Sequence, residues 1–279
     1  CFAQMKNHFV LYGIAPLGYS LGIIFGIVNL YPIYGVHGLI YGVLLGATLS
    51  LLIQLYSLRG KRMLEVLPYF SWKDIKELVA LGFPRTGVNV LTQGRIIFFT
   101  AVATTFGAGA LSSYLFAQRI TDAVSQIIQQ SITTASLPVL SKEFIEHRIQ
   151  EYRHVVKVYV ILLGLAGLAA STVIYLFQDV IVYVLYGATE YKDLITFFLG
   201  GFLVALPLHM MIGYFSISFY STKDTKSVFY SNAVSTIFAV AVCYSTLSLG
   251  VISLVYGVIT MSISNFLLIS LLYTRKKLN

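Results

Sequence analysis

The chain has 279 residues and a net charge of +8, and 57% of its residues are hydrophobic whereas only 11% are charged. Soluble domains carry roughly 25% charged residues, so this composition excludes an ordinary soluble fold and predicts a chain whose solvent is mostly lipid. The two cysteines and five histidines form no disulfide framework, CxxC motif or zinc-ligand spacing.

Eight segments are long and apolar enough to cross a membrane, if a span needs about 20 apolar residues. We therefore predict an all-α polytopic membrane protein with about eight transmembrane helices. The spans are 9–31, 34–58, 77–106, 109–138, 155–177, 193–221, 226–247 and 250–274. The third and fourth are more polar than the others. Because the chain starts at Cys1 and not at Met, we expect a fragment that lacks N-terminal sequence.

The distribution of Lys and Arg supports this count, because basic residues gather on the cytoplasmic side of membrane proteins. With the N-terminus inside, the inside loops are 1–8, 59–76, 139–154, 222–225 and 275–279. These loops and the flanking helix ends hold every Lys and Arg except Arg85, Arg95, Arg119 and Lys192. Topology thus explains the positive charge, and we predict no nucleic-acid partner.

Two connecting segments have patterns of their own. Residues 142–157 (KEFIEHRIQEYRHVVK) look amphipathic and predict a helical extension along the cytoplasmic surface. Outside the membrane, residues 178–192 (QDVIVYVLYGATEYK) predict a short, partly buried segment that turns at Gly187.

Ionisable residues at membrane depth are rare and costly, which makes each one a functional candidate. Arg95, Arg119 and Asp122 are the three that we select. Asp122 follows Arg119 by three residues, so the two side chains lie near one helix face and can pair. The polar stripe continues along the same helix through Gln126, Gln129, Gln130 and Thr133. A stripe of this length faces a partner helix or a watery cavity and not lipid.

The preceding helix carries a second polar stripe. Arg85, Asn89 and Thr92 follow i, i+4, i+7 spacing, with Gln93 beside them and Arg95 toward one edge. Two such helices among six apolar ones predict the wall of a hydrophilic pocket. Its arginines suit a phosphate or pyrophosphate, which a guanidinium binds through paired hydrogen bonds.

Structural roles for these residues stay open. Arg119 and Asp122 can form an ion pair that only locks helices together, and Arg95 can serve packing alone. His37 and His209 are single histidines in apolar surroundings, which favours packing or interface roles over proton transfer.

The last two spans hold polar side chains that could coordinate Na⁺, although helix–helix hydrogen bonding is their commoner use. These residues are Asn232, Ser235, Ser262, Ser264 and Asn265. The sequence contains no nucleotide-binding loop, no HExxH and no nucleophile–base set. We therefore predict neither an enzyme nor an ATP-driven pump, and no cofactor.

Three motifs resemble those of the MurJ-type lipid II flippases of the MOP exporter superfamily. Residues 111–142 contain Tyr114, Arg119 and Asp122 followed by LPVLS, which is similar to the family's eighth helix. Residues 83–93 (FPRTGVNVLTQ) resemble the entry to helix seven, and 219–227 (FYSTKDTKS) resemble the loop between helices ten and eleven. The motifs occur in the family's order and at compatible spacing.

The resemblance implies that the chain covers about helices five to twelve of the family, in a bacterial cytoplasmic (inner) membrane. Residues 1–58 would be the last two helices of the N-lobe, 59–76 a cytoplasmic linker, 77–274 a complete six-helix C-lobe, and 275–279 a basic tail. The family's cavity is lined by helices one, two, seven and eight, and the two polar-striped helices would be seven and eight.

The function that the resemblance implies is alternating-access translocation of lipid II, an undecaprenyl-pyrophosphate-linked peptidoglycan precursor, powered by Na⁺, H⁺ or membrane potential. Its partners would be lipid II, membrane lipids and cell-wall synthesis proteins. Arg119 matches the family's essential cavity arginine. The substrate-binding set that we expect is Arg119, Asp122, Arg95, Arg85, Gln93, Asn89 and Gln126, with Asn232, Ser235 and Asn265 as candidates for Na⁺.

Three positions depart from the family pattern. Val228 replaces a frequent proline, Arg95 replaces an uncharged polar residue, and Asp122 replaces a more usual glutamate. They leave other interpretations open: a flippase for O-antigen or capsule polysaccharide, a multidrug exporter of the same superfamily, or a membrane scaffold that transports nothing.

Overall fold

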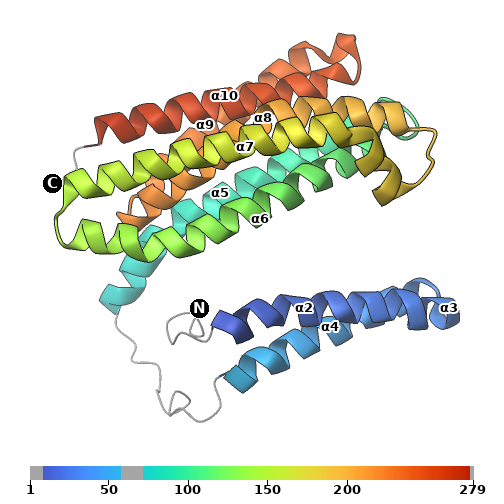
Figure 1. The fold of residues 1–279 in the computed structure, drawn as a ribbon, viewed down its shortest axis with the longest axis horizontal. Coiled ribbons are helices and arrows are strands. Elements are labelled where there is room, and N and C mark those ends of the chain that lie inside the picture. Colours follow the sequence, from blue (N-terminus) through green and yellow to red (C-terminus); the bar gives the residue numbers. More distant parts are fainter. Residues whose placement is uncertain (1–8, 58–71, 277–279) are drawn as a thin grey trace. The chain divides into compact units, whose positions relative to one another are not determined.

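The computed structural model describes residues 9–57 and 72–276, and within these ranges the chain is helical apart from short turns. The chain divides into two compact units, Cys1–Ser71 and Trp72–Asn279 (Figure 1). Within residues 9–57 and 72–276, six helices or helical runs are long and apolar enough to cross a membrane. The predicted all-α polytopic fold is thereby confirmed.

The first unit is a hairpin of two membrane spans. Its elements are α2 (Phe9–Phe25), the π-helix η1 (Gly26–Leu30), α3 (Tyr31–Tyr34) and α4 (Val36–Ser57). The chain reverses at Gly35, whose φ of +58° is a conformation that glycine adopts without steric cost.

Glycines let α2 and α4 approach until their backbones touch. A Cβ added to Gly22 would lie 2.2 Å from the Cα of Gly46, and one added to Gly26 would lie 2.5 Å from the Cα of Gly42. Real side chains do not tolerate such distances, so these positions require glycine. Close approach through small residues is a common way for helices to associate in lipid.

The second unit is a bundle of six long helices that run lengthwise beside one another (Figure 1). They are α5 (Trp72–Thr104), α6 (Ala110–Ile145), α7 (Ile149–Tyr186), α8 (Lys192–Ser221), α9 (Thr225–Ser245) and α10 (Ile252–Arg275), with a short 3₁₀-helix, η3 (Leu247–Leu249), before α10. Helix α5 begins inside the predicted linker 59–76, of which residues 59–71 lie outside the described part of the chain.

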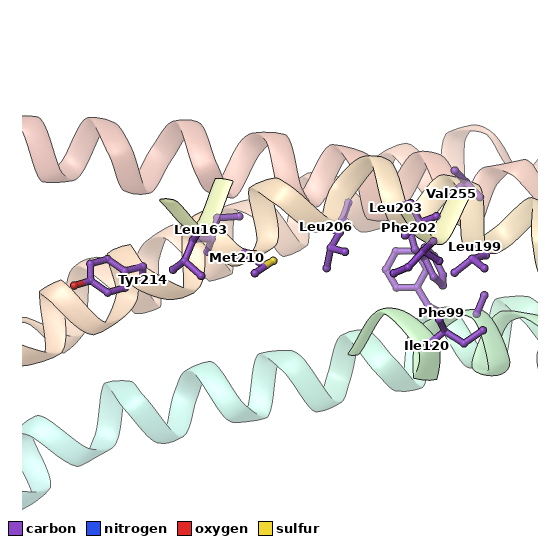
Figure 2. Close-up of a cluster of buried hydrophobic side chains, with 14 of the residues drawn as sticks. Phe99, Ile120, Leu163, Leu199, Phe202, Leu203, Leu206, Met210, Tyr214 and Val255 are labelled. Carbon is purple, nitrogen blue, oxygen red and sulfur yellow. The ribbon is translucent and has the colours of Figure 1, made fainter. Parts of the chain in front are cut away.

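Helix α8 lies at the centre of this bundle, packed against α6, α7 and α10. Its side chains from Leu199 to Tyr214 form a continuous buried row, which Phe99, Ile120 and Leu163 meet from neighbouring helices (Figure 2). The row gives the unit one hydrophobic core, around which the polar residues of α5 and α6 are placed.

Eight spans were predicted, and six segments satisfy both length and hydropathy: Pro16–Tyr34, Val36–Tyr56, and helices α7 to α10. Helices α5 and α6 contain 33 and 36 residues, which is ample length for a span. Their polar side chains keep their hydropathy below that of the other six. These are the two helices in which the sequence showed polar stripes.

The predicted separate segment at 178–192 is wrong for most of its length. Helix α7 continues through Tyr186 as one helix of 38 residues. It ends at Gly187, whose φ of +71° lets it terminate the helix. The turn at Gly187 was therefore correct, and the segment before it belongs to α7.

The predicted amphipathic helix at 142–157 is also wrong, because a turn divides it between α6 and α7. His147 adopts a φ of +55°, which breaks the helical path. Arg148 Nε lies 2.9 Å from Glu143 Oε2, and this ion pair bridges the turn. The amphipathic pattern thus arises from the ends of two helices and not from one surface helix.

Candidate functional site

The predicted polar residues of α5 and α6 fall into two groups with different surroundings. Arg119 and Gln126, seven residues apart on α6, are exposed, and so are Asn89 and Gln93 on α5. Spacings of four and seven residues keep each pair on one face of its helix. These side chains are therefore available to a ligand outside the bundle.

Arg85 is exposed one turn before Asn89 on α5, and it contacts an aromatic ring. Its guanidinium carbon lies 5.0 Å from the ring centroid of Tyr220 on α8. This is a cation–π distance, and it leaves the guanidinium hydrogen atoms free to bind an anion.

Arg95 and Asp122 face the interior of the bundle. They line a cavity of about 120 Å³ between α5, α6, α8 and α10. Its other polar lining residues are Tyr114, Gln118, Thr121, Ser125, His209 and Ser262. A second cavity, of about 200 Å³, shares Arg95, His209, Met261 and Ser262 with the first.

Asp122 lies near two arginines but forms no ion pair shorter than 4.0 Å with either of them. Asp122 interacts electrostatically with Arg119 and with Arg95. Within the described ranges, however, the ion pairs shorter than 4.0 Å join other side chains. The Arg95 guanidinium instead donates a hydrogen bond to the sulfur of Met261 on α10.

The candidate Na⁺ ligands bind one another across the α9–α10 contact. Ser231 Oγ donates to Asn265 Oδ1, and Asn265 Nδ2 donates to Asn232 Oδ1 at 3.4 Å. Ser235 Oγ donates to the carbonyl of Ser231 at 2.7 Å. Asn232 and Asn265 also line the second cavity, whereas Ser235 is buried and is not among its lining residues. In the described part of the chain, no three His, Cys, Asp or Glu side chains form a group that could hold a metal ion.

His209 is a further ionisable residue at the two cavities. A packing or interface role was predicted for it, and its side chain lines both cavities together with Arg95. The rule that selected Arg95, that ionisable residues at membrane depth are functional candidates, applies equally to His209 and would have found it.

The 219–227 motif forms a capped turn between α8 and α9. Asp224 Oδ1 accepts a hydrogen bond from the backbone N–H of Ser227 at 3.1 Å, and Asp224 Oδ2 accepts one from the Ser227 hydroxyl at 2.9 Å. Lys276 Nζ, at the end of α10, lies 3.3 Å from Asp224 Oδ2 and also donates to Thr222. Arg153 of α7 donates to the Lys276 carbonyl at 3.2 Å. The motif therefore ties α7, α8, α9 and α10 together at one end.

This cap makes stability depend on pH. Burial raises the pKa of Asp224, but the Ser227 hydrogen bonds and the charge of Lys276 outweigh burial, so its pKa lies below the usual value. A carboxyl whose folded pKa is depressed stabilises the fold above its unfolded pKa, and this contribution is lost as pH falls through the folded pKa. We expect Asp224→Ala to lower the unfolding free energy by about 1 kcal/mol at neutral pH.

Thermal unfolding of the purified protein in detergent checks this expectation. Asp224→Asn, which keeps an N-cap oxygen and loses the charge, should lie between the wild type and Asp224→Ala. The difference between wild type and Asp224→Asn should shrink in acid. A difference that is equally large in acid would show that the carboxylate charge contributes nothing.

A family model described as lipid II flippase MurJ matches residues 3–279 of the chain. A curated protein of Buchnera aphidicola subsp. Baizongia pistaciae (strain Bp), described as a probable lipid II flippase MurJ, is 24% identical over 200 residues. That match covers 68% of this chain and 38% of the relative, so the chain spans well under half of the relative's length.

Solved structures share the fold. A lipid II flippase MurJ in an inward closed conformation matches with a TM-score of 0.71 and 18% identity, over 94% of this chain and 56% of that one. A MATE protein in its straight conformation matches with a TM-score of 0.72 and 20% identity, over 91% and 59%. An outward-facing multidrug resistance MATE family transporter of the MOP superfamily matches with a TM-score of 0.71 and 20% identity, over 93% and 62%.

Proposed function

Since the chain belongs to the lipid II flippase MurJ family, we propose that it forms part of a flippase that carries lipid II across the bacterial inner membrane by alternating access. The family is one of membrane transporters and not of enzymes, and it resides in the bacterial inner membrane. The six apolar spans agree with that location. Lipid II, membrane lipids and cell-wall synthesis proteins are the partners we propose.

One observation carries the choice of an anionic lipid-linked substrate. Arg119, which matches the family's cavity arginine, is exposed on α6, and Gln126 is exposed two turns further along the same helix. A guanidinium binds pyrophosphate oxygens through two parallel hydrogen bonds. Gln126, Gln93 and Asn89 would contact the sugar or the phosphates, with Arg85 on α5 as a further cation.

Arg95 and Asp122 stand behind this face, in the interior of the bundle. We propose that they support transport from there and that they do not touch the sugar. Asp122 lies within electrostatic range of Arg119. It therefore reduces the net positive charge next to the substrate without forming a fixed ion pair.

A rescue experiment tests the proposed substrate. The complete gene that encodes this chain is expressed in bacteria depleted of their own lipid II flippase, beside an empty vector. Growth is expected with the gene and lysis with the vector. Lysis with the gene, at a membrane abundance equal to that of a working flippase, would contradict lipid II as the substrate.

Multidrug export is the second candidate, because MATE transporters match the fold as well as the MurJ structure does and because Asp122 lines a cavity inside the bundle. A drug exporter needs a carboxylate that attracts cationic compounds. Accumulation of a cationic dye in cells that express the gene separates the two candidates. Lower accumulation without rescue of growth would favour the exporter.

A further inference from the structure

A pair of stacked aromatic rings lies next to Arg119, at the end of the bundle where α6 begins and α7 ends (Figure 1). Phe116, three residues before Arg119, stacks on Tyr186 of α7 with ring centroids 4.2 Å apart and an interplanar angle of 14°. Three residues span about 4.5 Å along a helix and about 60° around it. The rings and the guanidinium therefore share one region of the α6 surface.

A hydrogen bond fixes the Tyr186 ring against α6. The Tyr186 hydroxyl donates to the backbone carbonyl of Phe116 at 3.2 Å, and the phenol interacts electrostatically with Arg119. Tyr186 is also the last residue of α7, and it packs against the hydrophobic core of the bundle. The pair thus forms a rigid, flat surface, which loses little conformational freedom when a ligand binds to it.

This arrangement differs from that of an aromatic anchor at the membrane interface. Tyrosines in such belts place the ring at the level of the headgroups, with the polar end in water. The Tyr186 hydroxyl instead bonds to the helix that carries Arg119. Phe116 remains 38% exposed after stacking, and Arg119, one turn further along α6, is exposed too. An open apolar surface and an open cation are therefore neighbours.

We propose that Phe116 and Tyr186 bind the first sugar ring of a pyrophosphate-linked glycolipid while Arg119 holds its phosphates. The inference rests on the proposed function and names the side chains that receive the sugar. In such a lipid a sugar carbon is bonded to a phosphate oxygen, so the group that binds the sugar must lie next to the group that binds the phosphate. One face of a sugar ring carries C–H groups, which leave water favourably for an aromatic surface.

The polyprenyl chain of the same lipid is a poorer occupant of this surface. Lipid tails surround the bundle and are as apolar as a hydrophobic side chain, so the polyprenyl chain gains no hydrophobic free energy by leaving them for Phe116. The sugar is transferred from water and does gain it. A bare pyrophosphate would use Arg119 alone. The combination of rings and guanidinium therefore favours a sugar with a phosphate attached.

Binding of two lipids tests this assignment. The complete protein that contains this chain is placed in lipid nanodiscs, and its affinities for lipid II and for undecaprenyl pyrophosphate, which lacks the sugar, are measured by native mass spectrometry. The wild type should bind lipid II more tightly. Phe116→Leu and Tyr186→Leu should each weaken lipid II binding about two- to ten-fold and leave binding of the sugar-free lipid unchanged. Arg119→Ala should weaken binding of both lipids.

Phe177→Leu is the matched control. Phe177 is an exposed aromatic residue nine positions before Tyr186, which places it on the opposite face of α7. The Phe177→Leu protein should bind both lipids like the wild type. Tyr186→Phe keeps the ring and removes only the hydroxyl, so it should retain most of the preference for lipid II even if Tyr186→Leu folds poorly.

Three results would overturn the inference. Unchanged lipid II affinity in Phe116→Leu and Tyr186→Leu would show that the rings do not touch the sugar, and the proposed function would stand. Equal losses of affinity for the two lipids would make the rings a support for Arg119 or a contact for the polyprenyl chain. A wild type that binds neither lipid would reject the proposed substrate and the inference with it.

Discussion

Replacing Arg119 with alanine is expected to abolish rescue of bacteria depleted of their lipid II flippase. Arg119 is exposed on α6 and is not engaged in an ion pair shorter than 4.0 Å among the described residues. Hydrogen bonds to charged groups contribute about 1.5–3 kcal/mol each, so losing even one of the two weakens substrate binding roughly ten- to hundred-fold, and Arg119→Ala loses both. Arg119→Lys keeps the charge but loses the paired geometry, and we expect partial rescue.

Growth and lysis at matched membrane abundance measure this effect. Arg275→Ala makes the same change at an exposed arginine in the last turn of α10, and it should rescue like the wild type. A scaffold that transports nothing would tolerate Arg119→Ala as long as it folds. Full rescue by Arg119→Ala would therefore remove the arginine from the transport cavity and favour the scaffold.

Replacing Gly42 with alanine is expected to destabilise the α2–α4 hairpin strongly. The new Cβ would lie 2.6 Å from the Cα of Gly26 and 2.9 Å from the carbonyl oxygen of Gly22. Both neighbours are backbone atoms, which cannot turn aside as a side chain can. The helices must separate, and the cost should reach about 3 kcal/mol or more, the upper range for overpacking.

Gly200 on α8 is the matched control. A Cβ there would meet no atom within 4 Å, so Gly200→Ala should leave stability unchanged or raise it slightly. Thermal unfolding followed by size-exclusion chromatography compares the two variants. Equal melting temperatures for Gly42→Ala and Gly200→Ala would contradict the close backbone contact.

The membrane spans could be predicted from the sequence because hydropathy and loop charge act on segments of about 20 residues. The ends of the helices could not. Helix α7 extends beyond the length needed for a bilayer, and hydropathy alone cannot show whether the chain outside the membrane stays helical. The break at 146–148 depends on the positive φ of His147, and no local sequence pattern predicts that conformation.

The polar residues of the candidate site could be predicted from the sequence. Which of them are exposed and which face the interior cavity could not. Arg119 and Asp122 are three residues apart, which places them about 60° apart around the helix axis. With an angle of that size, the two side chains can both face one cavity. Alternatively, one side chain can face the interior of the bundle while the other faces outward. Packing of α6 on α8 decides between these, and it turns Asp122 toward His209 and leaves Arg119 exposed. The orientation of a helix about its own axis is set by its contacts with other helices. The spacing of residues along one helix does not determine it.

The π-helix at Gly26–Leu30 has a consequence for how the hairpin stays in contact along its length. Contacts recur every fourth residue, at Gly22, Gly26 and Leu30 on one side and at Gly46, Gly42 and Gly38 on the other. An α-helix turns about 40° too far over each four-residue step, so a strict four-residue repeat slides off the contact line. A π-turn holds more residues per turn and rotates the face back. The wider turn thus compensates for the excess rotation, so that Leu30 contacts α4 on the same helix face as Gly22 and Gly26.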